Sequence, residues 1–368
     1  MATEDDAMIT SQTTDDDSTT DDGPIAAAAA DNTTAMQPTT TNNTRPHISW
    51  CDSYSKAQSA IDSLKSIIPH IPASLLSSET PAFALLHDPE IAIQCSHLLR
   101  QPDSGGGDNN LCRWFYDTFQ TSVPDLQLVV LRFLPVLAGV YLSRASLHKP
   151  LAGFEAVLLA LYAHETTARD GQAVTVCIPD ISHSSIYHES TQTLKNSATE
   201  LNMAVITPSL EPHGRVRSTR RARIVGVALE LYYSKISEMP VDSKIEFCEF
   251  FGTWAGEFGN NYDQPGIDNL RDGQNKNGNS RGGRINLSWE LLQPILRILG
   301  HCLMGPEQVE NKELREAASN ACRALYLRSL HDINSRSILA TGSLVKMSEE
   351  LTDSFDHTEI AQTNVISL

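Results

Sequence analysis

The chain has no lysine or arginine before Arg45, whereas nine acidic residues lie in that stretch. The whole sequence of 368 residues carries a net charge of −17 at pH 7, so −8 remains for everything that follows. A strongly acidic chain repels the phosphate backbone of DNA and RNA, which argues against general nucleic-acid binding. The part after Arg45 is only mildly acidic.

Large apolar side chains are also scarce in residues 1–44, which consist mainly of Thr, Asp, Ala and Asn. Such a segment buries too little surface to offset the entropy lost on ordering. We predict a disordered acidic tail over residues 1–44. The run from Ala26 to Ala30 is too short and too weakly apolar for a signal peptide, and acidic residues stand where its basic region belongs.

The chain lacks an apolar run long enough to cross a bilayer. The best candidate, Leu126 to Leu142, has seventeen residues and contains Arg132 and Pro135, whereas a membrane-spanning helix needs roughly 20 apolar residues. This stretch is apolar on nearly every side. It therefore predicts a helix inside a helical core, bent where Pro135 removes one backbone donor.

Cysteine pairs at metal-binding spacing are missing too. Seven cysteines, an odd number, occur without any Cys-x2-4-Cys pair, and several, such as Cys248 and Cys302, stand in apolar helical segments. This pattern is typical of reduced cysteines in a cytosolic core. His301 adjoins Cys302, but a metal ion would need two more ligands, and His331 is far along the chain. We therefore predict no metal site.

The nucleotide-binding and metalloprotease motifs GxGxxG, GxxxxGKS/T and HExxH do not occur, nor does a kinase HRD or DFG arrangement. The triplet Gly105 to Gly107 follows no predicted strand and has no lysine beside it, so we interpret it as a flexible linker. We predict no catalytic residue and no cofactor.

One dyad leaves an enzyme alternative open. His188 adjoins Glu189 and can act as a general base, with Ser184 or Ser185 as nucleophile, which would make the protein a hydrolase. Adjacent side chains seldom point at one another, however, and Tyr187, His188 and Glu189 at a loop end more often satisfy backbone groups of the neighbouring turn. The geometry of the side chains decides between the two interpretations.

Apolar residues recur at helical spacing through the second half of the chain. Two such segments flank Pro240 and predict a helical hairpin, and in a later one Ala318 and Ala321 let a neighbouring helix approach closely. We predict a mainly all-α fold of irregular helical hairpins, similar to a short solenoid. The segments are Val225 to Ile236, Phe247 to Phe258, Leu291 to Leu303, Glu313 to His331 and Ser337 to Leu351.

In one segment, side chains alternate between two faces instead of following helical spacing. Val174, Val176 and Ile178 face one side, which predicts a half-buried strand, and Met203 to Ile206 can pair with it in a small antiparallel hairpin. The length also fits two domains, but we predict one helical domain over residues 45–351. Residues 259–283, rich in Asn, Gly and Asp, are expected to be a disordered insertion, and residues 352–368 a flexible tail.

Three sequence blocks resemble the hyccin family. They are RFLPVLAGVYLSRAS from Arg132, which includes Phe133, Leu134 and Pro135, GFEAVLLALYAHE from Gly153, and the run from Ile178-Pro179 to Tyr187-His188-Glu189. With weaker similarity elsewhere, the resemblance covers about Pro81 to Met347. It implies a helical fold, and we expect a plant member of the family.

The resemblance also implies a function. Hyccins are non-catalytic accessory subunits that bind a tetratricopeptide-repeat subunit and so stabilise a type III alpha phosphatidylinositol 4-kinase. In plants the repeat subunit would be of the no-pollen-germination class, and a membrane-anchoring subunit would bring the assembly to the plasma membrane. The chain is accordingly expected in the cytosol and, peripherally, at the plasma membrane, where the kinase makes phosphatidylinositol 4-phosphate.

A basic cluster stands out in this acidic chain. Five arginines fall within nine residues, where they oppose the dipole of the helix that follows. In one interpretation they pair with carboxylates of this chain or of a partner. In a second they contact an anionic membrane surface, where each adds about 1 kcal/mol to the binding free energy. In a third they have no role. Lipid contact would make the protein a peripheral lipid-binding module. The residues are Arg215, Arg217, Arg220, Arg221 and Arg223.

Overall fold

The computed structural model describes residues 50–145, 147, 149, 151–179, 201–217, 219–256, 287–306 and 311–353. All of them belong to one contact unit, Ile48–Leu368. The predicted acidic tail and the predicted insertion at residues 259–283 lie outside the described residues, as does most of the predicted C-terminal tail. The expectations for these segments, and for the domain boundaries, stay predictions.

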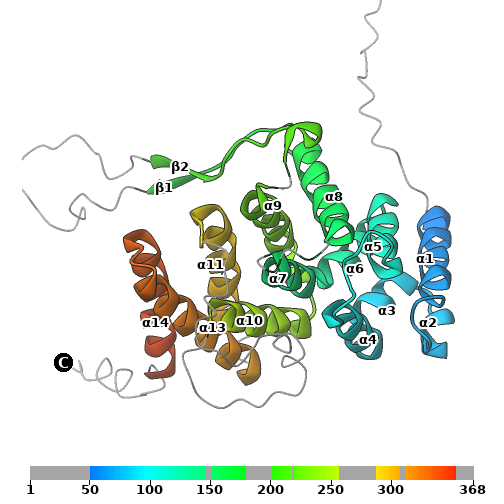
Figure 1. The fold of residues 1–368 in the computed structure, drawn as a ribbon. Helices are drawn as coiled ribbons and strands as arrows, with labels where there is room; N and C mark the ends of the chain where they lie inside the picture. Colours follow the sequence, from blue (N-terminus) through cyan, green and yellow to red (C-terminus); the bar gives the residue numbers. More distant parts are fainter. Residues whose placement is uncertain are drawn as a thin grey trace, which may run out of the picture. The chain divides into compact units, whose positions relative to one another are not determined.

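The described part of the chain is mainly helical and contains one two-stranded antiparallel sheet, as predicted (Figure 1). The strands are β1 (Val174–Pro179) and β2 (Leu201–Thr207). The helices are α1 (Trp50–Leu64), α2 (Ala73–Leu76), α3 (Pro81–His87), α4 (Pro89–Arg100), α5 (Asn110–Gln120), α6 (Pro124–Arg132), α7 (Leu134–Ala145), α8 (Ala152–Ala168), α9 (Arg221–Ser234), α10 (Val241–Ala255), α11 (Trp289–Met304), α13 (Lys312–His331) and α14 (Ser335–Asp353).

Local sequence explains where several helices begin. The side chains of Asp88, Asn109 and Asn311 each accept a hydrogen bond from the backbone N–H three residues later, which caps α4, α5 and α13. Proline occupies the first turn of α3, α4 and α6, where its missing N–H leaves no intrahelical bond unmade. Ser288 takes the N-cap position of α11, but its side chain makes no capping bond.

The apolar stretch predicted as one bent helix is two helices, α6 and α7, which meet at Phe133 at an angle of 45°. Pro135 cannot donate to the carbonyl four residues earlier and its ring would collide with it, so the helix breaks and restarts with Pro135 in the first turn of α7. The residues from Leu134 to Leu142 are all buried, as predicted. Among the described residues, no single helix is long and apolar enough to cross a membrane, whereas the bent pair α6 and α7 passes that test by length and composition.

Two polar side chains stabilise the break between α6 and α7. Arg132 is 2% exposed, and its guanidinium donates to the backbone oxygens of Leu86 and Asp88 where α3 meets α4. The Ser243 hydroxyl of α10 donates to the Arg132 carbonyl at 2.7 Å. The break therefore leaves these buried polar groups satisfied.

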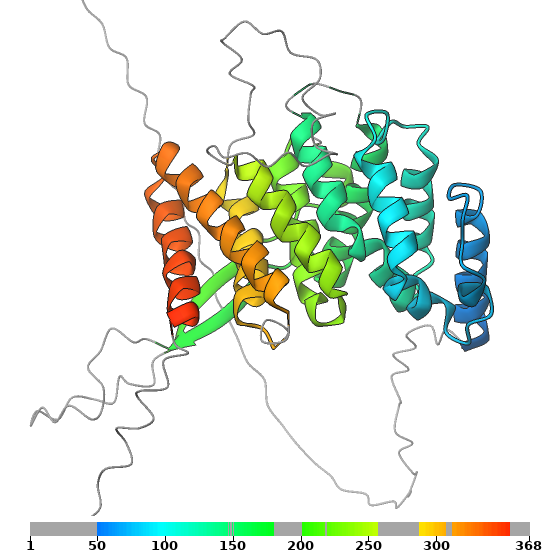
Figure 2. The same cartoon turned by 90° about the horizontal axis from the view of Figure 1, so that it is seen from below.

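The helices predicted from periodicity are confirmed, but the hairpin around Pro240 is wrong. α9 packs on α8 and α11, whereas α10 packs on α7 and α13, and the two helices meet at the stacked rings of Tyr232 and Phe247. Figure 2 shows α10, α13 and α14 side by side. As expected from its small residues, α13 comes close to α10, since a Cβ on Gly252 would lie 3.5 Å from Cα of Ala321.

The predicted strand pair is confirmed, with Val176 opposite Ala204 and Cys177 opposite Met203. The prediction that the first strand is half-buried is wrong, because residues 175–178 are exposed on both faces of the sheet. Alternation signalled the extended backbone correctly, but no helix in the described part of the chain covers residues 175–178.

The glycine triplet at residues 105–107 is an ordered turn and not a flexible linker. Gly105 has φ of +88° and lies so close to α8 that a Cβ would stand 2.4 Å from the Phe154 ring. Its carbonyl accepts a 2.9 Å hydrogen bond from the Gly153 N–H. Only glycine provides both the positive φ and the close approach.

Candidate interaction surfaces

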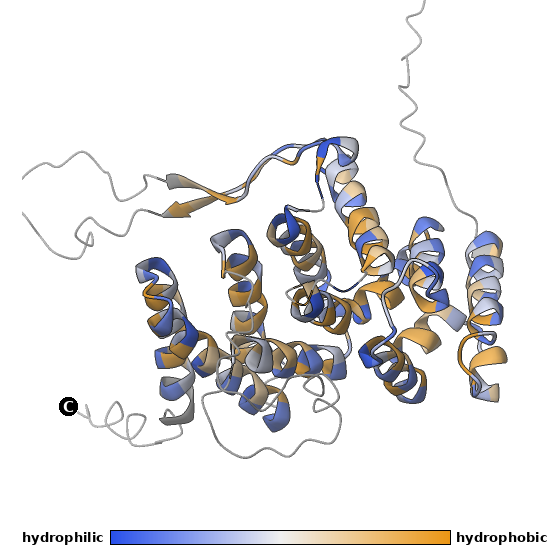
Figure 3. Ribbon diagram, viewed as in Figure 1, coloured by the Kyte–Doolittle hydropathy of each residue, from blue (hydrophilic) through white to orange (hydrophobic). Residues whose placement is uncertain are grey.

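An exposed apolar surface lies on the two-stranded sheet, whose strands are largely hydrophobic in Figure 3. Directly opposite residues of an antiparallel pair point to the same face, so Cys177 and Met203 share one face with Val205, and Val176 and Ile178 lie on the other. Met203 is 72% exposed, Val205 59% and Ile178 50%. We name these five residues the apolar ribbon.

The apolar ribbon is anchored at one end. Ile206 is half-buried and lines one pocket with residues of α11 and α14, and Thr207 is buried, whereas the ribbon residues are exposed. Neither strand has a second strand neighbour among the described residues. A two-stranded hairpin with apolar faces and free edges is only marginally stable by itself, and such a surface is typical of a site that another chain covers.

The five arginines of the basic cluster divide into two sets. Three of them pair with acidic residues of other elements: Arg220 with Glu211, Arg221 with Glu155 on α8 at 3.8 Å, and Arg223 with Glu290 on α11 at 3.8 Å. Glu155 also accepts a 3.1 Å hydrogen bond from the Tyr141 hydroxyl, and burial raises the pKa of Tyr141. Arg220, Arg221 and Arg223 thus pair with carboxylates of this chain, which was one of the expected alternatives.

Arg215 and Arg217 lie in and just after the short 3-10 turn His213–Arg215. Both are exposed, and neither forms an ion pair with another described residue. A contact of these two guanidinium groups with an anionic lipid or an acidic partner stays a prediction.

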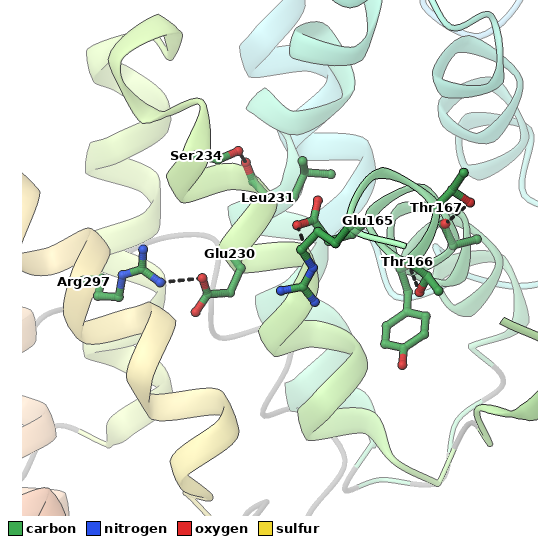
Figure 4. A network of polar contacts seen from close by, with 10 residues as sticks. Glu165, Thr166, Thr167, Glu230, Leu231, Ser234 and Arg297 are labelled. Atoms are coloured by element: carbon green, nitrogen blue, oxygen red, sulfur yellow. Dashed lines mark hydrogen bonds and ion pairs between the residues drawn. The ribbon is translucent and has the colours of Figure 1, made fainter. Parts of the chain in front are cut away.

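A polar network joins the helices below the hairpin. Arg297 reaches from α11 to Glu230 on α9, and Glu165 of α8 lies on the other side of α9 (Figure 4). The Arg297–Glu230 pair is 2.5 Å long, and the Arg297 guanidinium stacks 4.2 Å from the centroid of the Tyr233 ring. Arg169 holds Glu165 at 3.3 Å. The Arg297–Glu230 pair thus links α11 to α9, whereas the Arg169–Glu165 pair lies within the C-terminal end of α8.

Glu165 occupies a largely buried position near the C-terminal end of α8. Burial raises the pKa of the Glu165 carboxyl above its ordinary value, while the Arg169 guanidinium opposes the shift and the Glu230 carboxylate adds to it. The side chains of Glu165 and Arg169 are only 16% and 11% exposed, so solvent screens their attraction weakly.

The seven cysteines form no metal cluster with His, Asp or Glu among the described residues. Cys51 and Cys177 are exposed and the other five are buried, which confirms the predicted core positions of Cys248 and Cys302. Burial raises the pKa of Cys95, Cys112 and Cys322 to about 12, and that of Cys248 well above its ordinary value.

Thiol labelling of the native protein should therefore stop at two groups. We expect Cys51 and Cys177 to react quickly with a chromogenic disulfide reagent, because only an accessible thiolate attacks it. The five buried thiols should react only after denaturant is added. A third thiol reacting at the rate of Cys177 in native buffer would contradict the buried positions.

The residues of the blocks that resemble the hyccin family lie partly in the core, partly in the sheet and partly outside the described residues. Phe133, Leu134 and Pro135 are buried at the break between α6 and α7. Ile178 is exposed and Pro179 ends β1. Tyr187, His188 and Glu189 lie outside the described residues, as do Ser184 and Ser185, so the hydrolase interpretation is untested. The pentapeptide Gly278 to Gly282 fits GxSxG, a motif with meaning only on a strand-to-helix turn, and it also lies outside them.

Sequence reasoning missed two features of this region. The exposure of Met203 and Val205 depends on what covers the sheet, and local sequence carries no signal for that. The packing of Arg336 on Trp289, with the guanidinium 3.7 Å from the ring centroid, joins residues far apart in the chain.

Comparison with protein families gives one result. A family model described as Hyccin matches residues 76–367, well over half of the chain. The match includes all the blocks on which the resemblance was noted, and it extends beyond the expected Pro81 to Met347 at both ends.

Proposed function

The chain belongs to the hyccin family, and from this premise we propose that it is a non-catalytic accessory subunit of a phosphatidylinositol 4-kinase complex. It binds a tetratricopeptide-repeat partner, stabilises a type III alpha phosphatidylinositol 4-kinase and helps to target it to the plasma membrane. The synthesis of phosphatidylinositol 4-phosphate from phosphatidylinositol and ATP is carried out by the kinase.

The observation that supports this proposal is the apolar ribbon. Met203 and Val205 expose more than half of their surface on a sheet whose two strands have no further strand neighbour among the residues that the structure describes. A protein that functions in a permanent assembly leaves such a surface for its partner, because covering apolar side chains contributes free energy to association. A repeat protein offers long grooves between its helices that fit a projecting hairpin.

The remaining members of the assembly follow from the same premise. A membrane-anchoring subunit holds the complex at the plasma membrane, and the chain is cytosolic until its partners recruit it. In a plant, the repeat partner is of the no-pollen-germination class.

Affinity purification of the tagged full-length protein from its native cells, in mild detergent, tests the proposal. We expect a phosphatidylinositol 4-kinase and a tetratricopeptide-repeat protein to co-purify. The double variant Met203→Asp, Val205→Asp should recover about tenfold less of the repeat protein, as is usual for central contact residues. Ile93→Asp is the matched control, since Ile93 of α4 is 70% exposed and lies outside the ribbon.

Two results would redirect the proposal. Equal recovery by the double variant and by wild type would exclude the apolar ribbon as the contact. Recovery of the protein alone, together with binding to acidic vesicles that is lost in Arg215→Ala, Arg217→Ala, would identify a peripheral anionic-lipid-binding module instead.

A further inference from the structure

The turn before α9 carries an exposed hydroxyl group. Thr219 is exposed and lies between the 3-10 turn His213–Arg215 and the start of α9 at Arg221. The Arg220 N–H donates to the Arg217 carbonyl at 2.9 Å, so Thr219 lies in a hydrogen-bonded turn at the surface. Its hydroxyl makes no hydrogen bond with another described residue. A modifying enzyme can reach such a hydroxyl without unfolding a helix.

Arginines stand on both sides of this threonine at a spacing that protein kinases recognise. Arg217 lies two residues before Thr219, and Arg221 lies two residues after it. Arg215 lies two residues farther towards the N-terminus. Kinases that select basic residues bind such arginines in acidic pockets beside the phosphoryl-transfer site, so the charge pattern determines the acceptor. Thr80, exposed just before α3, has no lysine or arginine within four positions and lacks this pattern.

The fold accounts for three arginines of the basic cluster but not for the other two. Ion pairs with carboxylates of other elements hold Arg220, Arg221 and Arg223. Arg215 and Arg217 are exposed and form no ion pair with another described residue. Their positions before Thr219 suit the recognition of its hydroxyl by a kinase, and the binding of the phosphate afterwards.

The phosphate would lie within reach of these two arginines. Two residues of chain span at most about 7 Å, which limits the distance between the Cα atoms of Arg217 and Thr219. A phosphate on threonine carries about 1.5 to 2 negative charges and three acceptor oxygens. A guanidinium binds two such oxygens at once through parallel N–H donors. Because Glu211 already holds Arg220, Arg215 and Arg217 are the free donors beside the acceptor.

We propose that Thr219 is a phosphorylation site for a protein kinase that selects basic residues, and that the phosphate then pairs with Arg215 and Arg217. The kinase transfers the γ-phosphoryl group of ATP to the Thr219 hydroxyl oxygen. The bond between the γ-phosphorus and the bridging oxygen breaks, ADP leaves, and the hydroxyl proton passes to the base of the kinase. An anionic lipid or an acidic partner then finds no free guanidinium at this turn.

Phosphorylation of the native full-length chain by the catalytic domain of protein kinase C and ATP tests the site. This kinase selects arginines on both sides of its acceptor, and mass spectrometry of the peptides locates the phosphate. We expect phosphate on Thr219 and none on Thr80. Thr219→Val should lower the incorporation about tenfold or more, and so should Arg215→Ala, Arg217→Ala, because the kinase loses its acceptor or its charge contacts.

Two further variants serve as controls. Ser218→Ala removes the neighbouring hydroxyl and should be phosphorylated like wild type. Arg113→Ala, Arg323→Ala removes the same charge from exposed positions on α5 and α13 and should also behave like wild type. The assignment is overturned if the native chain carries no phosphate on Thr219, if the phosphate lies on Ser218 instead, or if Thr219→Val incorporates as much as wild type.

Hydrogen exchange tests the pairing of the phosphate with the arginines. Phosphothreonine installed at residue 219 during translation gives the modified protein with or without Arg215 and Arg217. The phosphorylated wild type should exchange the backbone amides of residues 213–220 about fivefold more slowly than the unmodified protein, because charge-assisted bonds order the turn. The phosphorylated Arg215→Ala, Arg217→Ala variant should exchange like its unmodified form. Equal exchange of wild type with and without phosphate would exclude the pairing.

Discussion

Replacing Arg144 by methionine is expected to lower the free energy of unfolding by about 3 kcal/mol or more, since each lost hydrogen bond to a buried charged group costs about 1.5–3 kcal/mol. Arg144 is 1% exposed on α7. Its guanidinium donates to the Ser104 carbonyl and hydroxyl at 2.6 and 2.7 Å, and to the carbonyls of Arg100 and Gln101 at 3.1 and 2.5 Å. Methionine keeps most of the volume but leaves these oxygens without a donor.

The carbonyls that Arg144 binds lie at the end of α4 and in the loop that follows, where no intrahelical donor remains. Urea unfolding followed by circular dichroism measures the effect. Arg113→Met is the matched control, because Arg113 is exposed on α5 and a surface substitution is expected to change stability by less than about 0.5 kcal/mol. Equal midpoints for the two variants would show that the bonds of Arg144 add little to stability.

The sequence predicted the helices well because their signal is local. Periodicity located α9, α10, α11, α13 and α14, and the strand pair followed from alternation and a nearby apolar run. Pro135 predicted the bend in the apolar stretch, although the break itself comes two residues earlier, at Phe133. A proline limits the helix on its N-terminal side, and the exact residue depends on which neighbours satisfy the freed carbonyls, here Ser243.

Packing partners were not predictable in the same way. Pro240 separates two helices, but whether these pair with each other or with α11 and α13 depends on the facing side chains of the whole domain. The same limit applies to the basic cluster. The partners of Arg220, Arg221 and Arg223 come from three separate parts of the chain, and no local pattern links them.

The burial of two arginines is a feature that composition does not predict. Arginine is mostly exposed in proteins, and Arg132 and Arg144 in the resemblance block carry no local sign of burial other than their apolar neighbours. Both are buried because they serve backbone oxygens at the ends of α3 and α4. An arginine inside a long apolar run can therefore indicate a buried helix end nearby.

Gly226→Ala should destabilise the protein by about 1–3 kcal/mol, the usual cost of overpacking, although alanine is favoured over glycine inside helices by about 1 kcal/mol. Gly226 of α9 lies against the first turn of α11, and a Cβ there would stand 2.4 Å from the backbone oxygen of Glu290. This backbone oxygen cannot move without shifting α11. That helix places Leu291 in the core and Trp289 in the pocket beside β2 and α14.

Gly300→Ala makes the same substitution in another helix, and we expect it to raise stability where Gly226→Ala lowers it. A Cβ on Gly300 would meet Met304 at 3.7 Å and Leu344 at 3.8 Å, which is ordinary van der Waals contact. The helix propensity then determines the outcome, and stability should rise by up to about 1 kcal/mol. Thermal unfolding of both variants beside wild type measures the two shifts. If Gly226→Ala also raised the melting temperature, α9 and α11 would lie farther apart than in this structure, and the backbone contact at Glu290 would not be what requires glycine there.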